Sequence, residues 1–272
     1  MKDSVALWFA RKSWIPHSFQ VEAWNAFERG DDALIQAPTG SGKTYAGLGG
    51  VVRSALKANA EGKTEQGLQV IWIAPIRALT KEIQMSAERL VEGTGLNWSV
   101  GVRTGDTLNK EKAAQRKKWP QILITTPESL HVLLAMKGSV QSFAGLKLMV
   151  VDEWHELMGT KRGTQVELAS AYFRTCAQDY RIWGISATIG NLVEAMEVLI
   201  GPHRSGTLIQ SQEVKHTEVH SLMPKRFERL PWAGHIGVKL AQDVVDVIQS
   251  HSSTLIFTNT RSQSEIWYQK LL

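Results

Sequence analysis

The sequence is poor in cysteine and has no long hydrophobic run. One cysteine, Cys176, excludes an intramolecular disulfide and a thiolate zinc cluster, and it fits a reducing compartment. No apolar run approaches the roughly 18 residues of a membrane span. The opening residues, MKDSVALWFARKSW, lack the apolar core and the cleavage site of a signal peptide. We therefore expect a cytoplasmic protein without membrane contact.

The composition is that of a folded domain. Hydrophobic residues make up 43% and charged residues 21% of the 272 residues, which excludes a disordered tail, a collagen-like fibre and a small disulfide scaffold. Lys and Arg number 31 against 26 for Asp and Glu, a formal net charge of +5. This excess is weakly indicative of a polyanionic partner.

Six short apolar or β-branched runs recur along the chain, and each predicts a buried strand. Segments with helical spacing lie between them, such as residues 79–91 and 130–134. This alternation predicts an α/β fold, a parallel sheet covered by helices on both faces. Ligands of such sheets bind beyond the carboxyl ends of the strands. The predicted strands are ALIQAP (33–38), LQVIWIAP (68–75), WSVGVRTG (98–105), QILITTP (121–127), LKLMVVDE (146–153) and RIWGISAT (181–188).

The composition of the sequence changes after Gly201 and Pro202, where a polar stretch begins. We place residues 1–205 in a first domain and residues 206–272 in a linker and the start of a second. Residues 206–272 contain a helical run around 238–248 and a strand, TLIFTNT (254–260). Two strands and one or two helices are too few to bury a core alone.

A phosphate-binding loop follows the first predicted strand and precedes an amphipathic run. Glycine-rich backbone amides at a helix N-terminus cradle a β-phosphate, a lysine reaches the β- and γ-oxygens, and the next hydroxyl ligates Mg²⁺. The alternative is a glycine-rich turn with an incidental Lys-Thr pair. Gly47, Gly49 and Gly50 are unusual in a helix and predict close packing against the sheet. The nucleotide-binding residues are Thr39, Gly40, Ser41, Gly42, Lys43 and Thr44, with Lys43 also catalytic and Thr44 also a metal ligand.

Two adjacent carboxylates, Asp152 and Glu153, end the fifth predicted strand. Asp152 is the second candidate Mg²⁺ ligand, and Glu153 is the candidate base that deprotonates the water attacking a γ-phosphate. A solvated turn at a helix start is the alternative. His155 is a candidate for coupling this pair to Ser186 and Thr188 by hydrogen bonding, since its ring both donates and accepts. A purely structural histidine is the other interpretation.

The phosphate loop, the Asp152-Glu153-Trp154-His155 box and the Ser-Ala-Thr tripeptide together resemble the first motor domain of superfamily 2 helicases. The resemblance implies a RecA-like P-loop fold, with residues 206–272 as the start of a second RecA-like domain. It also implies that Gln20 reads adenine through its side-chain amide. The candidate nucleic-acid contacts that the resemblance implies are Arg77, Thr104, Gly105, Asp106, Thr126, Pro127 and Glu128, with Thr260 and Arg261 from the second domain.

The wording APIRAL, TGDT, TTPESL and DEWH is most similar to the Lhr-like (large helicase-related) branch, including its ligase-associated members. Members are ATP-driven, Mg²⁺-dependent helicases that move 3′ to 5′ on single-stranded DNA in DNA repair. RNA, an RNA–DNA hybrid and a ligase partner are further implications. The later motifs and arginine fingers of the family are not in this sequence. We therefore expect ATP and nucleic-acid binding with poor hydrolysis and no unwinding.

Two other functions compete with a helicase motor. One is a P-loop kinase for a small molecule, and the other is a non-catalytic lobe that only binds nucleotide or nucleic acid. The basic run at 110–118 is either part of a strand-binding track or a solvated helix face. The sequence leaves the oligomeric state open. Trp72 and Trp183 are predicted core residues. The aromatic residues that are candidates for packing around adenine are Trp8, Phe9, Trp14, Phe19 and Trp24.

Overall fold

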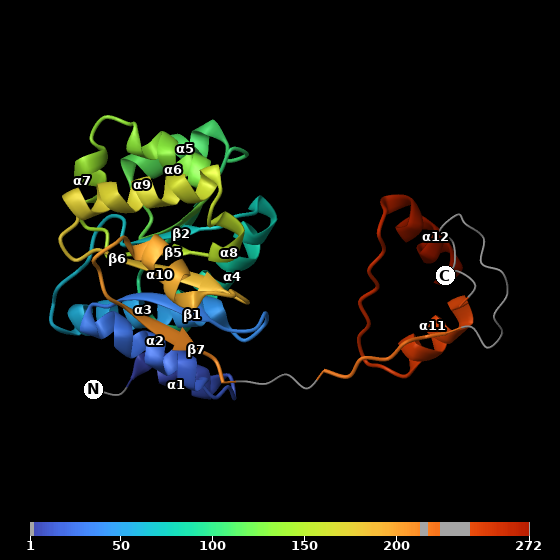
Figure 1. The fold of residues 1–272 in the computed structure, drawn as a ribbon. Coiled ribbons are helices and arrows are strands. Elements are labelled where there is room, and N and C mark those ends of the chain that lie inside the picture. Colours follow the sequence, from blue (N-terminus) through green and yellow to red (C-terminus); the bar gives the residue numbers. More distant parts are fainter. Residues whose placement is uncertain (1–2, 213–216, 224–239, 272) are drawn as a thin grey trace. The chain divides into compact units, whose positions relative to one another are not determined.

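The structure is a computed structural model that describes residues 3–212, 217–223 and 240–271, in two compact units (Figure 1). Residues 3–212 belong to the first unit, and the other described residues belong to the second. The first unit extends past the predicted boundary at residue 205, because a strand at 206–210 pairs with a strand of its sheet.

The first unit is built on a parallel sheet with the strand order β3-β4-β2-β5-β6-β1-β7 among the described residues. Every pairing is parallel, which confirms the predicted α/β class. All six predicted strands form, and β7 is the one that the polar character of its surroundings concealed. The strands are β1 Asp32–Gln36, β2 Val70–Ile73, β3 Val100–Arg103, β4 Ile122–Thr125, β5 Leu148–Val151, β6 Arg181–Ser186 and β7 Gly206–Gln210.

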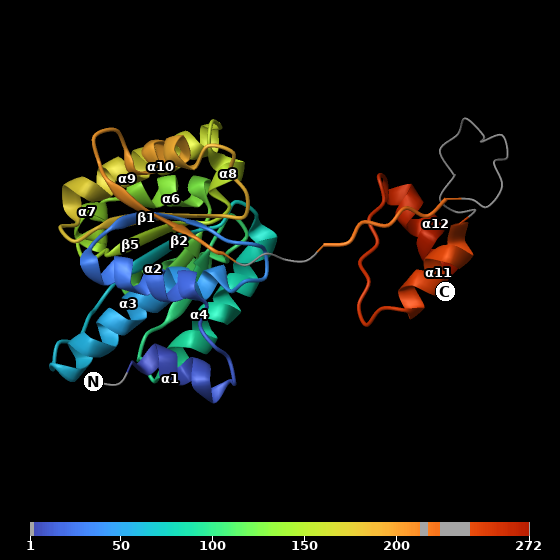
Figure 2. The same cartoon turned by 60° about the horizontal axis from the view of Figure 1, so that its bottom comes forward.

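Helices cover both faces of the sheet, and each face has its own hydrophobic core (Figures 1 and 2). The first face carries α1 (Ser4–Arg11), α2 (Ser18–Arg29), α3 (Lys43–Ala60) and α4 (Thr80–Thr94), the last preceded by the short helix η1 (Arg77–Leu79). The second face carries α6 (Pro127–Leu134), α7 (Ser139–Phe143), α8 (Trp154–Leu157), α9 (Lys161–Cys176) and α10 (Leu192–Ile200). The helix α5 (Asn109–Lys117) buries none of its residues.

Large aromatic side chains and glycines fix how closely the layers approach. Trp72 and Trp183 are buried in the core, as predicted. A Cβ on Gly47 would lie 2.9 Å from the Trp72 ring, so this glycine does pack against the sheet. Gly49 and Gly50 do not, because they face Trp24 and Phe27 of α2 instead. The expectation that all three face the sheet was therefore wrong for two of them.

The second unit contains α11 (Ala241–Gln249), which confirms most of the predicted helical run, and α12 (Arg261–Leu271). The predicted strand at 254–260 does not form, and Leu255 and Phe257 are 78% and 86% exposed. A strand needs a neighbour to pair its backbone, and the described part of this unit supplies none. Within the described ranges, no helix has the length and apolar character needed to cross a bilayer.

Candidate functional site

The strand order divides the carboxyl edge of the sheet into two halves. The ends of β5, β6 and β1 are neighbours, and they carry the acidic pair, the Ser-Ala-Thr tripeptide and the phosphate loop. We call these three strand ends the phosphate-loop half. The ends of β3, β4 and β2 are also neighbours, and the candidate nucleic-acid contacts of the first unit follow them. We call these the Arg77 half.

The phosphate loop curls between β1 and α3. Gly40 and Gly42 both have φ of +80°, a left-handed conformation that favours glycine, and α3 begins immediately after Gly42. The Ser41 hydroxyl donates to the Pro38 carbonyl at 2.7 Å, which tightens the turn. The Ala37 N–H donates to the Ser186 carbonyl at 3.0 Å, so the loop is tied directly to the end of β6.

Lys43 points toward the acidic pair. Its Nζ lies 3.5 Å from Glu153 Oε1, and the two side chains are 10% and 23% exposed. The buried Nζ has no hydrogen-bond partner among the described residues. A buried ammonium without hydrogen bonds is costly and gains from an anionic oxygen placed beside it. Thr44 follows in the first turn of α3, while Thr39 lies exposed in the loop.

The surroundings of Asp152 disfavour its ionised form. Burial raises its pKa to about 6, and the neighbouring Glu153 charge acts in the same direction. Hydrogen bonds from Trp72 Nε1 at 3.3 Å and from the Glu153 N–H at 3.0 Å oppose this shift, as does Lys43. Glu153 itself has φ of +45°, a strained left-handed conformation for a non-glycine residue. Strain and buried charge therefore concentrate at this pair.

The predicted contact between His155 and the Ser-Ala-Thr tripeptide is present at its first residue. His155 Nδ1 lies 2.8 Å from the buried Ser186 Oγ and 3.5 Å from Glu153 Oε2. Thr188 lies exposed beyond the end of β6, and no hydrogen bond joins it to His155 in the described structure. The histidine thus links the acidic pair to the strand that also anchors the phosphate loop.

Gln20 is buried beneath the phosphate loop. Its Nε2 donates to the Gly42 carbonyl at 3.0 Å, and its Oε1 accepts from the His17 N–H at 2.9 Å. In this structure the amide therefore holds the loop to the start of α2, and its role at adenine stays a prediction. No sequence motif marks Tyr45, whose carbonyl accepts a hydrogen bond from Trp24 Nε1 at 2.9 Å.

Most of the aromatic residues expected near adenine form one cluster on the face of the sheet that α1 to α4 cover. The rings of Trp8, Phe9, Trp14 and Tyr45 contact one another with centroids 5.2 to 6.0 Å apart. Trp24 joins this cluster through Phe9, at 5.5 Å. Phe19 does not, since its ring stacks on His17 instead.

The Arg77 half exposes its charges. Arg77 Nη1 donates to both carboxylate oxygens of Asp106, at 2.8 and 3.0 Å, and the two side chains are 60% and 71% exposed. A Cβ on Gly105 would lie 3.0 Å from Arg77 Nη2, so the guanidinium lies over this glycine. Thr104 is buried, and its Oγ1 accepts from the Asp106 N–H at 3.3 Å. The structure therefore joins residues from the ends of β2 and β3 into one surface.

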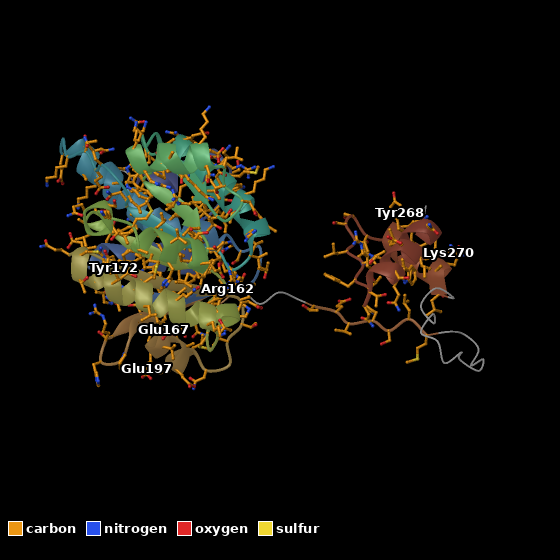
Figure 3. The ribbon with its side chains drawn as sticks, turned by 90° about the horizontal axis from the view of Figure 1, so that it is seen from above. Arg162, Glu167, Tyr172, Glu197, Tyr268 and Lys270 are labelled. Carbon is orange, nitrogen blue, oxygen red and sulfur yellow. The ribbon has the colours of Figure 1, made fainter. Side chains whose placement is uncertain are left out.

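Thr126, Pro127 and Glu128 form the start of α6. Thr126 caps the helix by accepting from the Ser129 N–H at 3.4 Å, and Pro127 occupies the first turn. Burial would raise the pKa of Glu128, but hydrogen bonds from its own backbone N–H and from Arg162 outweigh it and lower the pKa. No sequence motif marks Arg162, because it is a lone arginine in a helical segment. It lies at one end of α9, away from Tyr172 (Figure 3).

The remaining candidates are an exposed helix and a part of the second unit. The basic run forms α5, whose residues are not buried, and Lys112 Nζ donates to the Gly105 carbonyl at 3.2 Å. Arg261 begins α12, and Thr260 immediately before it accepts from the Gln263 N–H through its Oγ1 at 3.2 Å. Their role on a nucleic-acid strand stays a prediction.

The sequence is similar to those of known helicases. The family model for the DEAD/DEAH box helicase matches residues 17–196. A Sulfolobus acidocaldarius protein named ATP-dependent helicase Lhr-Core is 34% identical over 270 residues, which are 96% of this chain and 31% of that protein. The Lhr helicase/uracil glycosylase of Escherichia coli is 29% identical and is covered over 18% of its length.

A solved structure gives the same picture. The Mycobacterium smegmatis helicase Lhr, bound to single-stranded DNA and AMP-PNP, matches 98% of this chain and 35% of its own with a TM-score of 0.76 at 27% identity. The chain thus spans about a third of the length of the Lhr-Core relatives it matches.

Proposed function

The chain belongs to the DEAD/DEAH box helicase family, and from that membership we propose that it works in an Lhr-like motor that uses ATP to move 3′ to 5′ along single-stranded DNA. The single observation that carries the proposal is the meeting of Lys43 with the Asp152-Glu153 pair beneath the phosphate loop. The Lhr resemblance extends the proposal to DNA repair, to partners such as a ligase and to the cytoplasm.

The phosphate-loop half supports ATP hydrolysis through its own residues. Backbone amides of the loop bind the β-phosphate, and Lys43 exchanges Glu153 for the β- and γ-oxygens. Glu153, released from the lysine, orients the attacking water and accepts its proton. A series of contacts leads from Glu153 to His155 and from His155 to Ser186. It returns to the phosphate loop because the Ser186 carbonyl accepts a hydrogen bond from the Ala37 N–H.

The donor set fits Mg²⁺. Thr44 and Asp152 would hold the ion, through a hydroxyl and a carboxylate, which are the oxygen donors that Mg²⁺ prefers. Mg²⁺ suits so few protein ligands because it keeps several waters and takes others from substrate phosphates. When bound, it neutralises charge that develops on the phosphates. Asp152 must be ionised to take part, which its pKa of about 6 allows at neutral pH.

The Arg77 half supports a sequence-independent grip on a strand. A motor that moves along DNA must contact phosphates and sugars rather than base edges. Arg77, Thr104 and Thr126 offer a guanidinium, a threonine turn and a helix start, groups that bind phosphate oxygens without needing a base edge. The solved Lhr structure contains a single strand of DNA, which supports DNA over RNA as the ligand we propose.

The test is ATP turnover by this chain with and without single-stranded DNA. We expect single-stranded DNA and AMP-PNP to bind and turnover to stay poor, as the sequence predicts. Glu153→Gln should abolish whatever turnover the DNA raises while AMP-PNP still binds. Glu92→Gln, an exposed carboxylate of α4, is the matched control and should turn over as the wild type does. Turnover that ignores DNA and needs a small-molecule acceptor would identify a kinase. Tight nucleotide binding without any turnover would identify a non-catalytic lobe.

A further inference from the structure

Arg162 joins the two loops that carry the candidate strand contacts. Its Nε and Nη2 donate to the two carboxylate oxygens of Glu128 at 2.6 and 3.4 Å, and its Nη1 donates to the Pro75 carbonyl at 2.6 Å. Pro75 follows β2 and stands two residues before Arg77, while Glu128 lies in the first turn of α6 beside Thr126. One guanidinium thus sets the distance between the end of β2 and the start of α6.

The hydrogen bonds of Arg162 fix the positions of two loops and contribute little to the stability of the fold. The Arg162 and Glu128 side chains are 36% and 54% exposed, and exposed ion pairs contribute little to folding. The planar fork of arginine nevertheless fixes a carboxylate and a carbonyl at once, which the point charge of lysine does not reproduce. The arrangement therefore constrains loop positions more than it stabilises the fold.

Arg162 is connected to the acidic pair by a short, hydrogen-bonded segment of the chain. Glu153 is the N-cap of α8, which ends at Leu157, and α9 starts at Lys161. Thr160 Oγ1 donates to the Leu157 carbonyl at 2.6 Å and accepts from the Gly163 N–H at 3.2 Å. A Cβ on Gly163 would lie 2.3 Å from the Leu157 carbonyl oxygen, so α8 and α9 approach as closely as a glycine permits.

We propose that Arg162 is a positioning residue that transmits the state of the nucleotide site to the spacing of the strand-gripping loops. The inference rests on the proposed function. Lys43 leaving Glu153 for a nucleotide frees the start of α8, and α8 carries the start of α9 with it. Arg162 then shifts Pro75 and Glu128 together, because it bonds both.

The test uses Arg162→Lys, which keeps the charge and the helix but loses the fork. Fluorescently labelled single-stranded DNA is titrated with the full chain, with and without AMP-PNP, and nucleotide affinity is measured without DNA. We expect wild type to show a ratio of the two DNA affinities different from one. In the variant this ratio should move toward one, with DNA affinity lowered by about tenfold and AMP-PNP affinity unchanged. Lys161→Ala, which removes the exposed neighbouring charge, should behave as wild type.

Hydrogen exchange provides a readout that does not depend on DNA. Amides of residues 76–79 and 128–131 should exchange faster in Arg162→Lys, while those of α3 keep their protection. A variant with wild-type DNA affinity and affinity ratio overturns the inference, and so does a wild-type ratio of one. Loss of AMP-PNP binding in parallel with DNA binding would show a merely structural role and overturns it too. A wild-type chain that binds no DNA would instead refute the proposed function.

Discussion

The two halves of the carboxyl edge treat charge in opposite ways. In the phosphate-loop half, the Lys43 and Glu153 side chains are 10% and 23% exposed, and the buried Lys43 ammonium has no hydrogen bond within the described part of the chain. In the Arg77 half, the side chains of the ion pair between Arg77 and Asp106 are 60% and 71% exposed.

The difference follows from what each half has to bind. A phosphate group that reacts needs charges already desolvated and aimed, and that arrangement costs folding free energy before the ligand arrives. A strand that only has to be held and released is served by exposed charges, which are screened by salt and cost little to leave unpaired. Four substitutions or titrations can break or sharpen this contrast.

The largest expected effect is on nucleotide binding. Lys43→Ala should weaken ATP affinity by about 100-fold, because charge-assisted hydrogen bonds to phosphate in a buried site contribute roughly 1.5–3 kcal/mol. Lys112→Ala is the matched control from the other half, since its ammonium donates to the Gly105 carbonyl at 3.2 Å in an exposed hydrogen bond. Isothermal titration with ATP measures both. Equal affinities for Lys43→Ala and wild type would show that the loop does not bind phosphate.

Removing a buried charge from the phosphate-loop half should stabilise the fold, although it damages the site. Asp152→Asn removes a charge whose pKa burial has raised to about 6, and we expect it to raise the free energy of unfolding at pH 7.5 by up to about 3 kcal/mol. Asp106→Asn removes an exposed charge and should change it by no more than about 0.5 kcal/mol. Urea denaturation measures both variants. A destabilised Asp152→Asn chain would mean that Asp152 is well accommodated as an anion.

The pH dependence of stability tests the same carboxyl group. Its folded pKa of about 6 lies above the ordinary 3.8, so the folded chain binds the extra proton more tightly than the unfolded chain. The contribution of the protonated Asp152 carboxyl group to the free energy of unfolding is therefore fully present below about pH 4 and is lost as pH rises through 6. The stability difference between Asp152→Asn and wild type should grow over this window. A difference independent of pH would contradict the assignment.

The smallest effect is expected in the Arg77 half. Arg77→Ala should weaken binding to single-stranded DNA by about tenfold at low salt and leave ATP affinity unchanged. The slope of log affinity against log salt should fall by about 0.7, the value for one phosphate contact on a single strand. Fluorescence anisotropy at several salt concentrations measures both. An unchanged slope would show that Arg77 serves only its ion pair with Asp106.

The sequence by itself determined six of the strands in the sheet of the first unit, the order of the loops between them and the residue types in each loop, but not β7. Those features are local: a β-branched run specifies a strand, and Gly-Ser-Gly-Lys-Thr between a strand and an amphipathic run specifies a phosphate loop. Because all the strands are parallel, their carboxyl ends share one edge, and the sequence alone therefore placed the candidate residues of the first unit there.

Only the tertiary structure decided which loops are neighbours and which charges are exposed. His155 contacts Ser186 because β5 pairs with β6, and Arg162 reaches Pro75 across 87 residues of sequence. The polar segment at 206–210 became a strand only because the edge of β1 was open to it. Such contacts depend on how distant segments pack together, and the spacing of residues along the chain does not encode that packing.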